Sequence, residues 1–111
     1  MTGQDLWVEI TELRETLSLA INKLKERGQK KAKAEQDYRI ALRKIILIER
    51  DKGIPVTIIS DICRGDKEIA KLKFDRDIAE ILYETVQQKI YATKLELGIV
   101  ERQLEAERKG L

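Results

Sequence analysis

The sequence lacks histidine altogether and holds one cysteine and one proline among 111 residues. Without histidine, catalysis by the commonest general base of proteins is excluded, and we expect the chain not to be an enzyme. A single cysteine excludes an intrachain disulfide and any metal site built from several cysteines, so we expect no metal and no cofactor. Because no apolar run reaches the roughly 18 residues of a membrane span, we expect a soluble cytoplasmic protein with no membrane partner.

Charge is abundant but balanced. The chain has 22 Lys and Arg and 20 Asp and Glu, for a net charge of +2. That balance is too even for a surface devoted entirely to nucleic acid or to an anionic membrane. Aromatic residues make up only 5% of the chain, and alanine, leucine, isoleucine and long charged side chains dominate. This composition is typical of an all-α protein with long helices or a coiled coil.

Apolar residues recur in two long runs at alternating steps of four and three residues. This spacing is the a/d seam of a heptad repeat and predicts a helix packed along a partner helix. In the first run Arg27 and Lys31 interrupt the seam around Gly28, where the helix could break; in the second, Arg76 and Thr93 are the polar members. The two seams are Leu6, Ile10, Leu13, Leu17, Ala20, Leu24, Ala34, Tyr38, Ala41, Ile45 and Ile48, and then Ile69, Leu72, Arg76, Ala79, Tyr83, Val86, Ile90, Thr93, Leu97, Val100 and Leu104.

Capping signals bracket both runs. Thr2 and Asp5, three residues apart, predict a capping box before the first run. Gly53 predicts a left-handed helix end, and Pro55 prevents continuation of the helix. Asp66 is a favourable N-cap residue before the second run.

These signals predict a single all-α domain over 1–111. Its core is a long antiparallel helical hairpin resembling a coiled coil, with helix 1 at about 5–52 and helix 2 at about 66–108. A three-helix arrangement over about 5–27, 30–52 and 66–108 is the alternative. Further apolar residues off the second seam widen its stripe beyond what one partner helix covers. We therefore expect self-association into a helical-bundle homo-oligomer, a dimer or larger.

The connector over 53–65 is too apolar for a solvated loop. It reads as a strand or, with Thr57 as N-cap and Gly65 as C-cap, as a short helix. Its only cysteine, Cys63, lies in an apolar run and is expected to be a buried small side chain. In either form the connector is expected to cover one end of the bundle.

Two groups of charged residues are candidate binding sites. The segment 23–44 carries nine Lys or Arg against three acids, a net of +6. Such a patch suits a phosphate backbone, but a solvated helix face with ion pairs such as Arg39 with Glu35 is the interpretation that the sequence favours. The residues of this candidate nucleic-acid or anion patch are Lys23, Lys25, Arg27, Lys30, Lys31 and Lys33.

The second group lies at the connector. Arg64 and Lys67 flank the start of the second helix, where free backbone N–H groups favour an anion; Asp66 opposes this, because its carboxylate occupies the same amides. Arg76 falls on the seam and must be paired, with Glu80, Asp77 or a carboxylate across the interface. It either sets the register or holds an anionic ligand. With Thr57 of the connector, these residues form the candidate binding site.

The middle of the chain, over about 35–105, resembles small helical proteins encoded by phages and prophages of Gram-positive bacteria. The matching pieces are YRIA at 38–41, GIPVT at 53–57, RGD at 64–66, the stretch 72–79 and KLEL at 94–97. The resemblance carries no active site. It implies a small phage accessory protein in the host cytosol that acts by binding.

We therefore expect a non-enzymatic phage accessory or anti-defence protein that binds a host protein or complex as a helical oligomer. One alternative is a binder that sequesters an anionic nucleotide at an oligomer interface. Another is an accessory factor that binds nucleic acid through the basic segment.

Overall fold

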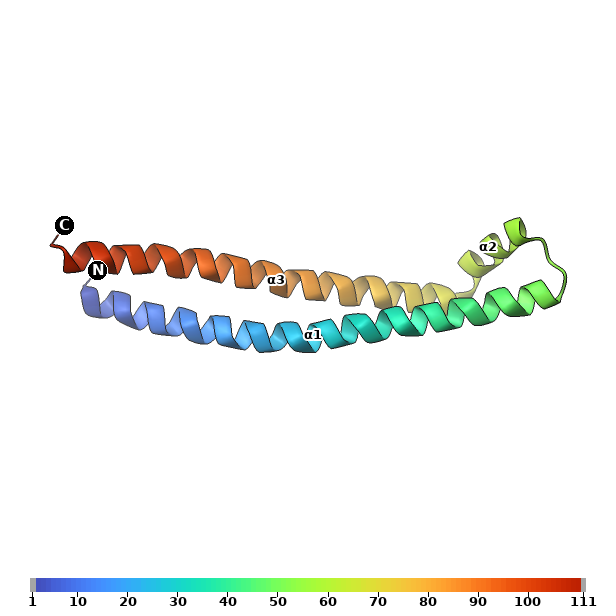
Figure 1. The fold of residues 1–111 in the computed structure, drawn as a ribbon, viewed down its shortest axis with the longest axis horizontal. Helices are drawn as coiled ribbons and strands as arrows, with labels where there is room; N and C mark the ends of the chain where they lie inside the picture. The colour runs from blue at the N-terminus through green and yellow to red at the C-terminus, as the bar shows by residue number, and fades with distance from the viewer. Residues whose placement is uncertain (1, 111) are drawn as a thin grey trace. The chain divides into compact units, whose positions relative to one another are not determined.

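A computed structural model describes residues 2–110, and this part of the chain contains three α-helices and no strand. They are α1 (Gly3–Asp51), α2 (Val56–Gly65) and α3 (Lys67–Arg108) (Figure 1). The all-α prediction is confirmed, and of the two alternatives for the connector the short helix is the one found. Within residues 2–110, no helix combines the length and the apolar character that crossing a membrane requires.

The helices contribute to two compact units. Unit 1 comprises Met1–Glu26 and Glu84–Leu111, and unit 2 comprises Arg27–Tyr83. In each unit a part of α1 packs against a part of α3, and unit 2 also contains α2. The long helix pair of the prediction is therefore present.

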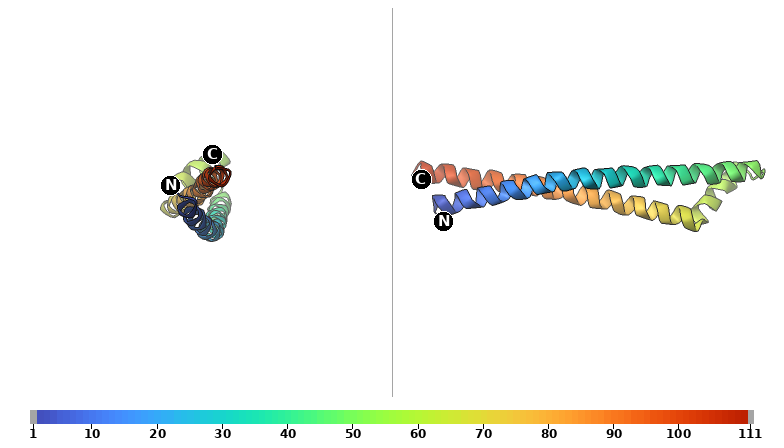
Figure 2. Two further views of the ribbon diagram at one scale, coloured as in Figure 1. Left: turned by 90° about the vertical axis from the view of Figure 1, so that its left-hand side faces the viewer. Right: turned by 90° about the horizontal axis from the view of Figure 1, so that it is seen from below.

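Unit 1 is closed by apolar contacts between the beginning of α1 and the end of α3, which lie side by side (Figure 2). Leu6, Ile10 and Val100 form its buried cluster, and Leu13, Leu97 and Leu104 pack against them. At the first turn of α1, a Cβ added to Gly3 would stand 3.6 Å from a side-chain carbon of Glu107. These contacts establish that the two helix segments run in opposite directions.

In unit 2, α2 is amphipathic and attaches through one face. Ile59 and Cys63 are buried, and because they are four residues apart they lie on the same side of α2. Ile69, in the first turn of α3, is buried too. Val56, in the first turn of α2, and Ile58 are exposed. The expectation that Cys63 is a buried small side chain is confirmed.

The heptad seams match the observed burial. Every position of the second seam is buried or half-buried, and so is every position of the first except Ile48. Thr93 is a buried polar member, and its hydroxyl donates a hydrogen bond to the carbonyl of Lys89 at 2.7 Å. The large apolar residues of α3 that were expected to widen the stripe are exposed; they are Phe74, Ile78, Ile81, Leu82, Leu95 and Ile99. The register of both helices is therefore confirmed.

The predicted ends of the long helices are also present. The Asp5 N–H donates to the Thr2 hydroxyl at 3.2 Å and the Thr2 N–H to the Asp5 carboxylate at 3.3 Å, which completes the capping box. Gly53 has φ +78°, and the Gly53 and Ile54 N–H groups bond to the carbonyls of residues 50 and 49, the pattern of a Schellman motif.

Three predictions at helix interiors and ends differ from the structure. α1 runs through Gly28 without a break, so the three-helix arrangement over 5–27, 30–52 and 66–108 is not formed. Thr57 is not the N-cap of α2: Pro55 occupies that position, without a side-chain hydrogen bond, because a proline needs no N–H partner and fits the start of a helix. Gly65 is the last helical residue, and Asp66 follows it as the cap.

Candidate functional site

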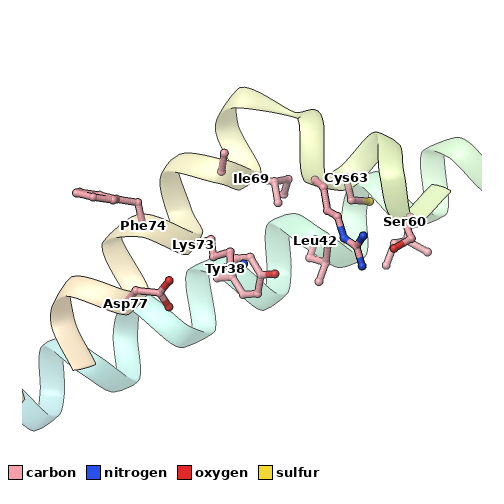
Figure 3. Close-up of a pocket in the computed structure, with 11 residues that line it drawn as sticks. Tyr38, Leu42, Ser60, Cys63, Ile69, Lys73, Phe74 and Asp77 are labelled. Atoms are coloured by element: carbon pink, nitrogen blue, oxygen red, sulfur yellow. The ribbon is translucent and has the colours of Figure 1, made fainter. Parts of the chain in front are cut away.

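Unit 2 contains an open groove of about 690 Å³ between α1, α2 and the beginning of α3. Figure 3 shows its labelled side chains arriving from all three helices. The lining is mainly apolar. Its residues are Tyr38, Leu42 and Ile46 from α1, Ser60, Cys63 and Arg64 from α2, and Ile69, Ala70, Lys73, Phe74 and Asp77 from α3.

The turn between α2 and α3 lies between two lining residues of this groove, Arg64 and Ile69. Asp66 has extended backbone dihedrals, and its carboxylate accepts a hydrogen bond from the Ile69 N–H at 2.9 Å. The cap therefore ends α2 and starts α3 within one residue, whereas the reversal of the chain lies before α2, between Asp51 and Val56 (Figure 1). This confirms the N-cap prediction for Asp66. Because its carboxylate holds an amide of the first turn of α3, an added anion would have to compete with it.

The predicted connector residues are only partly gathered at the groove. Arg64 lines it, with an 80% exposed side chain and a long contact of 3.9 Å to Asp61. Lys67 is exposed at the start of α3, and Thr57 is exposed in the first turn of α2; neither is among the lining residues. The structure instead brings Lys73 to the groove, one and a half turns into α3.

Arg76 does not line the groove, but it contacts two residues that do, Asp77 and Tyr38. Its guanidinium contacts the Asp77 carboxylate at 3.1 Å and the Glu35 carboxylate of α1 at 3.6 Å. It also stacks over the Tyr38 ring at 4.5 Å. The Asp77 hydrogen bond is the main cause that raises the pKa of Arg76, and burial opposes it. The guanidinium therefore stays charged through the neutral range.

Two of the partners predicted for Arg76 are confirmed by these contacts, Asp77 and a carboxylate across the helix pair. Glu35 bridges two cations, since it also accepts from Arg39 at 2.7 Å, the predicted i,i+4 pair. For the groove, the consequence is electrostatic. The one carboxylate in the lining, Asp77, is paired with Arg76. The remaining charged side chains of the lining, Arg64 and Lys73, make the groove positive.

The basic residues of 23–33 are largely engaged with neighbours. Lys23 pairs with Glu26 at 3.4 Å and Lys33 with Asp37 at 2.8 Å. Lys31 lies over the Tyr83 ring at 4.7 Å. Arg27 is half-buried, whereas Lys25 and Lys30 are exposed. These contacts are those of a helix face that satisfies its own charges.

The groove itself was not foreseen from the sequence. Tyr38 and Ile69 belong to the predicted seams, Leu42 follows the seam position Ala41, and nothing in the sequence distinguishes Lys73 from the other lysines. Their association depends on where α2 comes to rest, which no spacing in the chain encodes. Among residues 2–110, no group of three or more Cys, Asp or Glu side chains is arranged to hold a metal ion.

Comparison of the chain with protein-family models, with curated proteins and with solved structures found no match. The fold and the groove are therefore the basis on which function has to be argued.

Proposed function

We propose that the chain is a non-enzymatic phage accessory protein with an anti-defence role, which works as a helical oligomer and binds a host protein in the groove of unit 2. The observation that carries this proposal is the chemistry of the groove. An apolar lining of about 690 Å³ falls within the size of protein binding sites, roughly 300–1,000 Å³. The resemblance to phage-encoded helical proteins supplies the biological setting.

The charges of the groove define the partner that fits. With Asp77 held by Arg76, the cations of the lining are Lys73 and Arg64, and Arg64 has only the long 3.9 Å contact with Asp61. A matching partner segment would have apolar side chains that are buried against Leu42 and Ile69. Carboxylates flanking them would lie at Arg64 and Lys73. Because both cations are exposed, they contribute mainly to the association rate and to specificity.

Charge reversal tests the proposal. The double variant Arg64→Glu, Lys73→Glu keeps the apolar lining and inverts the charge of the groove. Lys71→Glu is the matched control, because Lys71 is an exposed lysine of α3 outside the lining. Each protein is immobilised and exposed to cytosol of a Gram-positive host, and captured proteins are quantified by mass spectrometry.

We expect a host protein that the wild type and Lys71→Glu capture equally and that the double variant captures at least tenfold less. Equal capture by the double variant would show that the groove is not the binding site. Unchanged helicity of all three proteins by circular dichroism excludes unfolding as the cause.

One alternative ligand is favoured by a specific observation, the aromatic ring of Tyr38 in the same lining as Arg64 and Lys73. A ring to stack on and two cations suit an anionic nucleotide. A thermal-shift panel that includes cyclic nucleotides tests it. A stabilisation that is lost in the double variant supports sequestration, and the absence of any shift removes it.

A further inference from the structure

α3 presents a second apolar stripe to solvent in unit 2. We call Phe74, Ile78, Ile81 and Leu82 the outer stripe; their exposed fractions are 64%, 39%, 55% and 38%. Phe74, Ile78 and Ile81 each lie two residues after a seam position, and two residues turn a helix by about 200°. These three residues are therefore on the side of α3 opposite α1, and Leu82, one residue before the seam position Tyr83, flanks them. Phe74 also forms one edge of the groove, and Figure 3 shows it extending away from the other labelled side chains.

The outer stripe has the periodicity of a helix-packing seam. Its steps of four and three residues repeat those of the seam that contacts α1. Unit 1, considered by itself, shows the same feature, because the exposed residues Leu95 and Ile99 lie two residues after Thr93 and Leu97. An incidental scatter of exposed apolar residues has no such period.

α1 has no comparable stripe in unit 1. Two residues after its seam positions stand Val8, Glu12, Glu15, Leu19, Asn22 and Glu26, of which Val8 and Leu19 are exposed apolar residues that do not follow one another at steps of three or four. The face of α1 away from α3 is thus suited to water. In unit 2, α1 also exposes Ile40 and Leu47 two residues after its seam positions Tyr38 and Ile45, but only on α3 do such residues follow one another at steps of four and three.

The exposed area of the chain is large for its mass. The accessible surface is 8365 Å² for 12.9 kDa, whereas a compact monomer of that mass exposes about 6,300 Å². The excess of about 2,000 Å² is more than the roughly 800 Å² that each partner contributes to a standard interface. Only seven hydrophobic residues of the described part are buried, so the core of one chain is small.

We propose that a second copy of the chain packs on the outer stripe, with Ile78 and Ile81 at the centre of a two-fold symmetric interface. This deepens the oligomeric part of the proposed function by naming the surface. A two-fold interface brings the same patch of both subunits together, so an apolar stripe of helical period is complementary to itself. The large exposed area and the small number of buried hydrophobic residues favour a second copy over a host protein, because the surface to be covered is present in the isolated chain.

Paired variants test this interface. Ile78→Glu, Ile81→Glu places charges in the outer stripe outside the groove lining. Leu19→Glu is the matched control, since Leu19 is 64% exposed on α1. Sedimentation equilibrium gives the molar mass of each. We expect a dimer for the wild type and the control, and self-association weakened at least about a hundredfold in the double variant, tenfold for each central residue.

Cross-linking provides a readout that does not depend on the stability of a charged variant. Cys63 is the only cysteine, so Cys63→Ala gives a thiol-free background for one introduced cysteine. A short bismaleimide should join two chains of the Ile78→Cys variant efficiently, and should leave the Leu19→Cys variant monomeric.

A wild type that is monomeric at about 100 µM, or equal cross-linking at positions 78 and 19, would overturn the inference. A double variant that stays fully dimeric would do the same. Ile78 and Ile81 do not line the groove, so these results are independent of binding there. Binding in the groove is tested by the charge reversal of Arg64 and Lys73. Conversely, failure of host-protein capture would leave a dimer measured on the isolated chain intact.

Discussion

Gly28 lies inside α1, and its replacement by alanine measures directly whether the helix is continuous there. The positive-φ glycines among the described residues are Gly53 and Gly110, so Gly28 has a backbone that alanine adopts without strain. Alanine is favoured over glycine in a helix interior by about 0.8–1.0 kcal/mol. An added Cβ would lie 3.4 Å from Cε2 of Tyr83, which is a close van der Waals contact worth about 0.1–0.2 kcal/mol for each atom pair.

We therefore expect Gly28→Ala to raise the free energy of unfolding by about 0.5–1 kcal/mol, somewhat less than the full propensity gain if the Tyr83 ring has to move. Urea titration followed by far-UV circular dichroism measures this value. Gly98→Ala is the matched control, because the nearest atom there is the end of the flexible Arg102 side chain at 3.5 Å. The reasoning is refuted if Gly98→Ala stabilises the protein while Gly28→Ala destabilises it by 1 kcal/mol or more.

Three further substitutions test the packing and the caps by the same titration. Ile10→Ala, at a position 1% exposed, should cost about 2–4 kcal/mol, because it opens a cavity in the unit 1 cluster; a loss below 1 kcal/mol would mean that this cluster is not the core. Thr93→Val should be neutral or stabilising by up to about 1 kcal/mol, since the hydroxyl bonds only to the Lys89 carbonyl, and a marked loss would contradict this. Asp66→Ala should cost about 1 kcal/mol through the lost bond to the Ile69 N–H, whereas Asp66→Asn should retain most of it.

Helix positions and burial were predictable from the sequence because they depend on local spacing. Alternating steps of four and three residues predict which side of each helix is covered, and the burial of Ile10, Thr93 and Val100 follows that pattern. The caps at Thr2 and Asp66 need only two or three neighbouring residues, so the signal for each is complete within the segment itself.

The possible break at Gly28 and the N-cap at Thr57 show where local signals fail. A glycine inside a helix lowers propensity by about 1 kcal/mol, and the packing of α1 on α3 readily offsets that loss. At α2, the fixed φ of Pro55 initiates the helix before Thr57 can cap it. The groove could not be predicted from residue spacing, because Arg64 of α2 and Lys73 of α3 line the same groove only in the folded arrangement of the three helices.

Arg76 illustrates an intermediate case. A charged residue on a seam predicts a paired cation, and the partners Asp77 and Glu35 bear this out. The Tyr38 ring beneath the guanidinium comes from the opposite helix, and that contact required the register between the two helices.

The dependence of thermal stability on protein concentration tests the central claim, that one chain needs a second to complete its core, most directly. Anything that binds only the folded state raises its stability by mass action, by about 2.7 kcal/mol for a hundredfold excess over the dissociation constant. If folding is coupled to dimerisation, the midpoint of unfolding should rise by about 5–10 °C over a hundredfold increase in concentration. A midpoint that stays constant over that range would contradict the account.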